Sequence, residues 1–321
     1  MRYTRLGPAG PVVSAVGLGS LALSGAYGRV DPGEADRLVR RAVDAGVTLL
    51  DTADFYAAGQ VESLIGHAIA GRADQVVVST RGGARVLGPK GPVLFDGRPD
   101  FLERSCDASL KRLRTDCIDL YYLHCQDERV PLEASMGRLA ELVRAGKIRH
   151  LGLSNGTPEQ IQRAHAVHQV CAVGVEYSLW GRCPGPELLA TARELGIAVV
   201  AARPLGRGFL TGRMRRQARL VPGDWRRADT RFRPEHRRSS AGRLQALESV
   251  AAQLDLGTGR LALSWLCSQG EHVVPVPSTR DLVHLEMNLA AAPVRLPPET
   301  LDTLAGLFPA GHYAQSPSPL L

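Results

Sequence analysis

Residues 49–56 read LLDTADFY, an apolar run that ends in an acid and is followed by a phenol five residues after that acid. If residues 47–50 form a buried strand, Asp51 and Tyr56 lie where the strand opens into a loop. In a parallel α/β barrel, this end of a strand carries the catalytic residues. An Asp that caps the loop and a Tyr that packs on it would explain the same two residues without catalysis. The rest of the sequence has to decide between these interpretations.

Short apolar runs alternate with amphipathic segments along the chain. Strands are predicted at residues 16–21, 47–50, 76–80, 118–123, 148–153, 173–176, 197–201 and 273–277. Helices are predicted to begin near residues 31, 59 and 157, and to cover 100–113, 131–145, 186–195, 241–254, 260–269, 281–290 and 298–307. Eight strand-then-helix units indicate an α/β protein of the (β/α)8 TIM barrel class.

Two segments depart from this repeat. Residues 1–16 hold two alternating stretches around the turn sequence GPAGP, which predicts an N-terminal β-hairpin. Residues 203 to about 240 form a long irregular loop after strand 7. No linker or low-complexity segment divides the chain, so residues 1–321 are predicted to form a single (β/α)8 barrel domain.

Composition narrows the classes of function and location. No apolar stretch approaches the roughly 20 residues that cross a bilayer, and the first residues lack the apolar core of a signal peptide, so a cytoplasmic location is expected. The six cysteines form no C-x-x-C pair, and neither disulfides nor a metal site are expected. The net charge of +7 predicts an anionic partner, such as nucleic acid, an acidic membrane surface or a phosphorylated cofactor.

Six fragments at the ends of predicted strands or in the segments after them share a family pattern. They are DTAxxY at 51–56, LYYLH at 120–124, GKIRxxGLSN at 146–155, EYS at 176–178, PLGxGxLxG at 204–212 and Asn288-Leu289. Each is weak alone, but together and in this order they resemble the aldo-keto reductases. That resemblance implies hydride transfer from NADPH to the carbonyl group of a small molecule, with the cofactor extended across the barrel mouth.

The resemblance assigns catalytic roles to four positions. Tyr56 corresponds to the proton donor, His124 to the residue that orients the carbonyl, and Asp51 to the partner of a lysine on the third strand. This chain has Arg81 at the lysine position, within TRGG at 80–83. A guanidinium keeps the positive charge but cannot lend a proton. Three interpretations stay open: a rearranged proton relay, a substrate that needs less acid assistance, or a barrel that has left redox chemistry. Lys90 is a weak candidate to substitute.

The resemblance also implies a set of NADP(H)-binding residues. Ser154 and Asn155 match contacts of the nicotinamide amide, Tyr177 matches an aromatic that stacks on the ring, and Asn288 matches an adenine contact. Arg280 offers a cation for the 2′-phosphate, next to Ser278 and Thr279 at the start of the last barrel helix. The loop that folds over the pyrophosphate corresponds to Pro204, Leu205, Gly206, Gly208, Leu210 and Gly212, whose glycines let backbone N–H groups approach phosphate oxygens.

Residues 203–238 contain twelve arginines together with Trp225 and Phe232. Basic residues with aromatics are typical of nucleic-acid binding, but the resemblance places this segment over the phosphates of the cofactor, and neither nucleic acid nor a membrane is expected as a partner. The excess of charge is suited to an acidic substrate. Two alternatives remain: redox-neutral chemistry, such as a dehydration or isomerisation, on an NADP-binding barrel, and a nucleotide-binding partner protein similar to potassium-channel β subunits. The sequence does not indicate the oligomeric state.

Overall fold

Eight parallel strands form the centre of the molecule in the computed structural model, which describes residues 1–86, 93–182, 184–213 and 220–309. The strand order is β12-β11-β10-β9-β8-β5-β4-β3. Their bounds are β3 Leu18–Gly19, β4 Leu49–Asp51, β5 Val77–Gly82, β8 Ile118–Leu123, β9 Ile148–Ser154, β10 Val170–Glu176, β11 Ala198–Ala202 and β12 Val273–Pro275. These strands lie at the eight predicted positions.

Backbone hydrogen bonds close the sheet on itself. Gly17 N–H donates to Pro275 O at 3.0 Å, and Gly19 N–H donates to Pro277 O at 3.1 Å. A side chain at Gly19 would have a Cβ 2.5 Å from Val276 O, so only glycine allows this close approach. Because the first and last strands are joined in this way, the predicted (β/α)8 barrel is confirmed.

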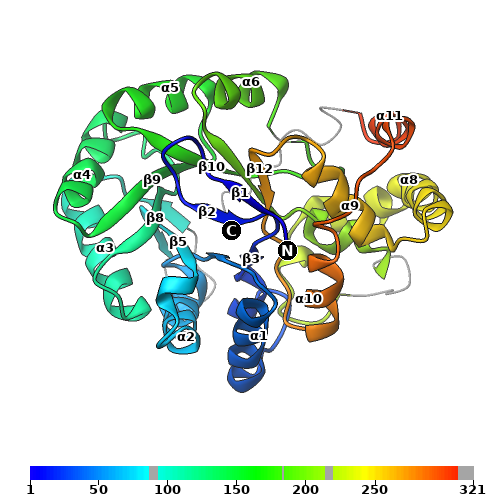
Figure 1. Ribbon diagram of the computed structural model, residues 1–321, viewed down its shortest axis with the longest axis horizontal. Coiled ribbons are helices and arrows are strands. Elements are labelled where there is room, and N and C mark those ends of the chain that lie inside the picture. Colours follow the sequence, from blue (N-terminus) through cyan, green and yellow to red (C-terminus); the bar gives the residue numbers. More distant parts are fainter. Residues whose placement is uncertain (87–92, 183, 214–219, 310–321) are drawn as a thin grey trace.

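Helices surround the barrel, with the strands inside (Figure 1). They are α1 Pro32–Asp44, α2 Gln60–Ala68, α3 Pro99–Leu113, α4 Leu132–Arg144, α5 Pro158–Val167, α6 Pro186–Glu194, α8 Pro234–Gln253, α9 Thr258–Cys267, α10 Leu282–Leu289 and α11 Pro298–Leu307. Among the described residues, no helix has both the length and the apolar character to cross a bilayer.

Local sequence signals explain where several helices begin. The Asp31 carboxylate accepts the Glu34 N–H at 3.0 Å, with Pro32 in the first turn, so α1 starts where its cap predicts. Thr157 and Gln160 form the reciprocal capping box expected for α5. Each cap satisfies backbone donors that lack partners inside the helix.

The N-terminal hairpin is confirmed as β1 Tyr3–Arg5 and β2 Val12–Ser14. In Figure 1 it lies across the barrel opening. Leu6 and Val13 are fully buried there and join the apolar side chains that fill the barrel interior, among them Leu49, Leu120 and Val200. The hairpin therefore covers the end of the barrel where the strands begin. The opposite end, where the strands finish, is the one that can admit a ligand.

Three features differ from the sequence predictions. Helix α8 begins at Pro234 rather than at residue 241, because its first turns are polar and carry no apolar periodicity. The long segment before it contains short 3-10 helices, η4 Gly206–Thr211, η5 Trp225–Arg227 and η6 Thr230–Phe232. A further hairpin, β6 Ala84–Val86 with β7 Val93–Phe95, follows β5 and was not predicted. Lys90 lies outside the described residues.

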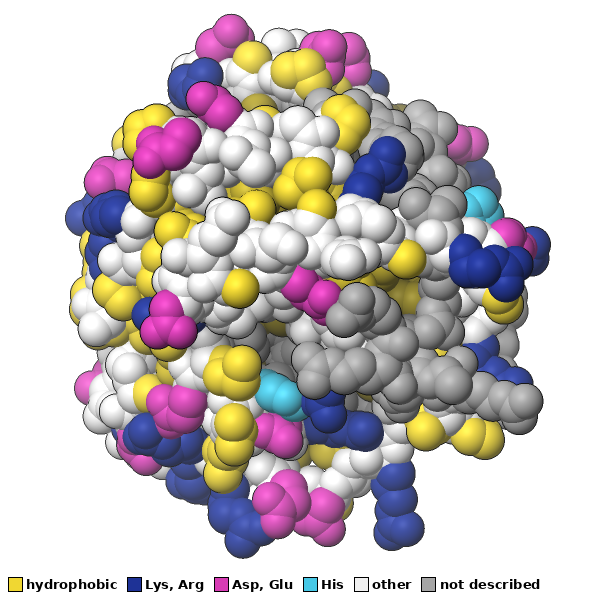
Figure 2. Space-filling model, turned by 90° about the vertical axis from the view of Figure 1, so that its right-hand side faces the viewer, with side chains coloured by type: hydrophobic (Ala, Val, Ile, Leu, Met, Phe, Trp, Pro, Cys, Tyr) yellow, Lys and Arg dark blue, Asp and Glu magenta, His cyan; other side chains and the backbone are white. Residues whose placement is uncertain are grey.

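The face that α8 and α11 cover carries side chains of both charge signs around its edge (Figure 2).

Within the described ranges, no group of three or more His, Cys, Asp and Glu side chains is arranged to hold a metal ion.

Candidate active site

A cavity of about 850 Å³ opens at the mouth where the barrel strands end. Its walls come from the C-terminal ends of β3, β4, β5, β8, β9, β10, β11 and β12 and from the segments that follow them, so every strand of the barrel contributes. All four predicted catalytic residues line it: Asp51, Tyr56, Arg81 and His124. The barrel topology therefore brings together residues that lie 73 positions apart in sequence, which is the usual arrangement of an active site in this fold.

Asp51 and Arg81 form a buried ion pair at the ends of neighbouring strands. β4 and β5 are aligned so that Asp51 lies beside Ser79, and the Ser79 hydroxyl donates to Asp51 Oδ1 at 2.8 Å. Arg81 Nη2 donates to the same carboxylate oxygen, while Arg81 Nε donates to Thr52 O at 3.1 Å. The guanidinium thus divides its donors between the carboxylate and the backbone instead of holding Asp51 with both arms.

Tyr56 is a buried phenol that stays protonated at neutral pH. Burial raises the pKa of Tyr56, the Arg81 guanidinium lowers it and the Asp51 carboxylate raises it, so that the net pKa lies above the usual value of 10. Ala57 and Ala58 follow in the left-handed region, with φ of 48° and 53°, a conformation that L-residues rarely adopt. The loop thereby turns sharply and leaves the phenol at the cavity wall.

His124 lies at the end of β8 between aromatic rings. Its imidazole centroid is 4.8 Å from the Phe55 ring and 6.1 Å from the Phe95 ring. The backbone N–H of His124 donates to Gly82 O at 2.9 Å, which ties its position to β5. Phe55 also packs edge-on against Tyr56 at 5.1 Å, so one apolar side chain contacts both proposed reacting groups.

Two polar residues, Ser154 and Asn155, lie at the end of β9, and only Asn155 lines the cavity. Asn155 lines the cavity with a left-handed φ of 53°, and its amide nitrogen is 3.4 Å from His124 O. Ser154 is 1% exposed, and its hydroxyl has no hydrogen-bond partner among the described residues. It lies next to Gly174, whose missing side chain leaves space, and Gly174 is itself a wall residue. A buried hydroxyl without a partner is uncommon, and a ligand amide could satisfy it.

Tyr177 is not brought to the cavity. Its ring packs edge-on against Trp265 at 5.6 Å, and its hydroxyl donates to Gln269 Oε1 at 3.4 Å. The physical reason is strand alternation: Gly174 and Glu176 of β10 line the cavity, so the next side chain points away. Its ring-stacking role remains a sequence prediction that this placement does not support. Ala202 and Arg203, at the end of β11, line the cavity instead.

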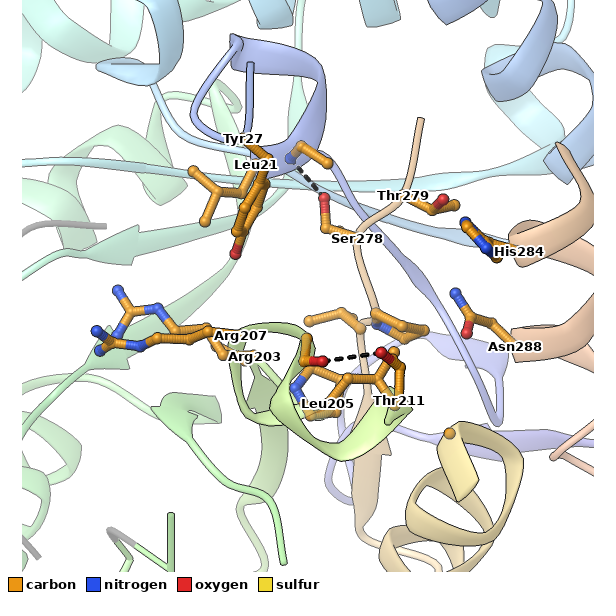
Figure 3. A pocket seen from close by; sticks show the side chains of 18 of the residues that line it. Leu21, Tyr27, Arg203, Leu205, Arg207, Thr211, Ser278, Thr279, His284 and Asn288 are labelled. Carbon is orange, nitrogen blue, oxygen red and sulfur yellow. Dashed lines mark hydrogen bonds between the residues drawn. The ribbon is translucent and has the colours of Figure 1, made fainter. Parts of the chain in front are cut away.

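The predicted pyrophosphate loop follows β11. Pro204, Leu205 and Gly208 line the cavity, whereas Gly206, Leu210 and Gly212 are not among its wall residues. The three glycines have φ of 56°, 88° and 73°, so the turn depends on the left-handed conformations that glycine adopts easily. The Thr211 hydroxyl donates to Gly208 O at 2.8 Å and holds the loop closed on itself, as the lower dashed line of Figure 3 shows.

The opposite end of the cavity holds Ser278, Thr279, Arg280 and Asn288, which the sequence analysis assigns to cofactor binding. Ala22 N–H donates to the Ser278 hydroxyl at 2.6 Å, and the Thr279 hydroxyl accepts the Asp281 N–H at 3.1 Å, just before α10. His284 was missed by the sequence analysis. It also lines the cavity beside Asn288 (Figure 3), and its Nε2 is 2.9 Å from Arg213 Nη1.

A second group of charged residues was also missed. Glu176, at the end of β10, accepts hydrogen bonds from Arg203 Nη1 at 2.6 Å, Arg207 Nη2 at 2.6 Å and Arg231 Nη1 at 2.7 Å. Burial raises the pKa of Glu176, but the three guanidiniums outweigh it and hold the net pKa well below the usual value. The arginine run indicated positive charge, but nothing in the sequence indicated that one carboxylate gathers three of these side chains.

Comparisons with known proteins agree with this fold. The model of the Aldo/keto reductase family matches residues 15–308. The structure of a glycerol dehydrogenase from Gluconobacter oxydans is 27% identical, with a TM-score of 0.88 over 99% of this chain and 98% of that chain. A thermostable aldo-keto reductase in complex with the inhibitor epalrestat is 29% identical, with a TM-score of 0.76 over 96% of this chain and 100% of that one. An aldo/keto reductase from Klebsiella pneumoniae, in complex with NADP and acetate, is 25% identical, with a TM-score of 0.75 over 96% of each chain.

Proposed function

The chain belongs to the aldo/keto reductase family and is an oxidoreductase by that membership, and we propose that it uses NADP(H) to reduce an aldehyde, ketone or related C=O or C=N group of a small molecule. The observation that carries the proposal is that Tyr56, His124 and the Asp51–Arg81 pair all line the same cavity. The aldo/keto reductase from Klebsiella pneumoniae, which is 25% identical to this chain, has a structure in complex with NADP.

Residues on the cavity wall and next to it fit a dinucleotide. Ser154 is not a wall residue, but it lies next to Gly174, which is one. Its hydroxyl is buried without a hydrogen-bond partner among the described residues, and it can accept a hydrogen bond from a carboxamide or donate one to it. Arg280 and the start of α10 lie at the far end of the wall, where a phosphate is favoured. Bound NADPH would supply the hydride, and Ser154, Asn155, Arg280 and Asn288 are the residues that would hold it.

Proton transfer is the task of the protein itself. Tyr56 is protonated at neutral pH and can donate its phenolic proton to a carbonyl oxygen, while His124 orients that oxygen. The positive charge of Arg81 stabilises the phenolate that forms. Because a guanidinium keeps its protons, Arg81 cannot return one to Tyr56, and water in the open cavity must do so. Arg81 is therefore an electrostatic partner of Tyr56 rather than a proton relay.

The test is to incubate the protein with NADPH carrying deuterium at the transferred position and a panel of aldehydes and ketones. We expect deuterium in the alcohol product and one nicotinamide oxidised per turnover. Tyr56→Phe is the matched variant, since it removes only the hydroxyl, and it should lower kcat by about 10²–10⁴-fold. Product that carries no label, with no nicotinamide consumed, would show redox-neutral chemistry instead. Tight NADPH binding without turnover over the whole panel would favour a nucleotide-binding partner protein.

A further inference from the structure

The end of the cavity near Tyr56 has an unusual wall of guanidiniums and aromatic rings. Arg203, Arg207 and Arg226 all line the cavity, together with Tyr27. In Figure 3 the guanidiniums of Arg203 and Arg207 lie on the side of the Tyr27 hydroxyl, and Thr279, His284 and Asn288 lie at the opposite end. The arginines therefore stand away from the residues proposed to hold the adenosine part of the cofactor.

The cluster is built to hold positive charge in a partly apolar setting. Arg207 lies over the Trp225 ring at 4.6 Å, and Arg226 lies over the Tyr27 ring at 4.8 Å. Trp225 is itself anchored, since its backbone N–H donates to Ala26 O at 3.1 Å, next to Tyr27. Aromatic faces stabilise cations and exclude water, so charges in this wall act on a ligand more strongly than charges in solvent.

The cluster combines guanidiniums with carboxylates. The described members are four guanidiniums, Arg203, Arg207, Arg226 and Arg231, and three carboxylates, Glu176, Asp224 and Asp229. The side chains of Arg207 and Arg231 are only 0% and 5% exposed, and both form ion pairs with Glu176. Arg203 is the member whose influence reaches the reacting group, because its positive charge acts to lower the pKa of Tyr56 against the effect of burial.

The backbone at Arg203 has a left-handed φ of 51°, an uncommon conformation for a residue other than glycine. Arg81 is another guanidinium on the cavity wall, and its positive charge also acts on Tyr56. A ligand at Tyr56 would therefore meet the positive charge of both side chains.

We propose that Arg203 recognises an oxyanion on the substrate, so that the preferred carbonyl compounds carry a carboxylate or a phosphate. This inference rests on the proposed function, because it names the substrate class of the same site. Guanidinium is suited to the task because its planar fork of donors matches two oxygens of a carboxylate or phosphate. The proton and hydride transfers remain those proposed above. Arg203 binds the oxyanion, which takes no part in the reaction.

The experiment compares matched substrates on the wild type and on Arg203→Gln. One pair is succinic semialdehyde and its methyl ester, which tests the carboxylate. The other is glyceraldehyde 3-phosphate and glyceraldehyde, which tests the phosphate. We expect R203Q to lower kcat/KM by about 10–100-fold for the members of the favoured charged class, as loss of a charge-assisted hydrogen bond predicts, and by less than about 3-fold for the uncharged members. R203Q should fold, since Glu176 keeps Arg207 and Arg231.

Arg227→Gln is the matched control. Arg227 comes from the same basic segment but is exposed and outside the cavity wall, so R227Q removes the same charge without touching the site. An equal loss in R227Q and R203Q would show long-range attraction and overturn the proposal. Equal kcat/KM values of the wild type for the charged and the uncharged member of each pair would also overturn the proposal. A rise in the NADPH dissociation constant of R203Q with unchanged discrimination would assign Arg203 to the cofactor.

A binding measurement separates this inference from the proposed function. Succinate and inorganic phosphate, which cannot be reduced, are titrated calorimetrically into the wild type and into R203Q, both saturated with NADP⁺ so that the phosphate sites of the cofactor are already occupied. Binding that the wild type shows and R203Q has lost would establish the oxyanion subsite even if no carbonyl in the panel were reduced. Equal binding by both proteins, or none by either, would overturn it even if the enzyme proved to be a reductase.

Discussion

Two buried ion-pair systems line the same cavity and are built in different ways. Asp51 and Arg81 stand on adjacent strands, and their register is set by the sheet. Glu176 stands on a strand, but its three guanidinium partners come from the irregular segment after β11. The first system has one cation for its carboxylate, and the second has several. A single pair depends on each partner, whereas a cluster tolerates the loss of one outer member.

The largest effect is expected from breaking the single pair. Arg81→Met leaves the Asp51 carboxylate buried with the Ser79 hydroxyl but without a cation, and should lower the free energy of unfolding by about 3–5 kcal/mol. Urea denaturation at pH 7 measures this change. The double variant D51N/R81M should recover part of the loss, because no buried charge remains. A loss below about 1 kcal/mol in R81M would mean that the pair is not the fragile system we describe.

Removal of the central carboxylate of the cluster should have the next largest effect. Glu176→Gln leaves three guanidiniums facing one another, but Asp229 still neutralises part of their charge. We expect a loss of about 2–4 kcal/mol in the same denaturation experiment. An unchanged free energy of unfolding would show that the cluster is held by its aromatic contacts and not by Glu176.

The pH dependence of stability should separate wild type from E176Q. The folded-state pKa of Glu176 lies below its ordinary value of 4.5, so its contribution is fully present above pH 4.5 and is lost as pH falls toward the folded-state pKa. Between neutral pH and pH 3, the wild type should therefore lose more stability than E176Q loses. The comparison uses thermal unfolding over that range, and parallel curves for the two proteins would contradict the assignment.

The smallest effect is expected from an outer member of the cluster. Arg203→Gln removes one of three guanidiniums on Glu176 and leaves Arg207 and Arg231 in place. Part of the lost ion pair is offset because glutamine can still donate a hydrogen bond, and the change in unfolding free energy should stay below about 1 kcal/mol. If R203Q proved as unstable as R81M, the cluster would not be redundant, and the contrast between the two systems would disappear.

Much of the fold could be predicted because local physics fixes it. Asp31 and Pro32 start α1 as their capping chemistry requires, and the apolar runs became the eight barrel strands. The strand-end residues Asp51, Arg81 and His124 line one cavity because parallel strands all end at the same mouth. The family pattern, read at those positions, predicted these three residues and Tyr56 as catalytic, and all four line that cavity.

Other features depended on contacts that no local signal reports. Tyr177 matched a stacking residue in sequence, but strand alternation and packing against Trp265 turn it away from the cavity. His284 lines the cavity because α10 packs beside the barrel mouth. A single histidine in a helix gives no sequence signal that its side chain will line a cavity. Helix α8 begins early because its first turns are polar and lack the periodicity that sequence analysis uses.

The sequence by itself determined the order of strands and helices, the strand-end side chains and the surplus of arginine, because each follows from residues close together in the chain. Only the tertiary structure decided which carboxylate those arginines meet. Glu176 and Arg231 are 55 residues apart, and their contact exists because the closed barrel and the return of the long segment place them together. Which charges face each other is decided by the three-dimensional path of the chain, since electrostatic attraction depends on distance in space and not on separation in sequence.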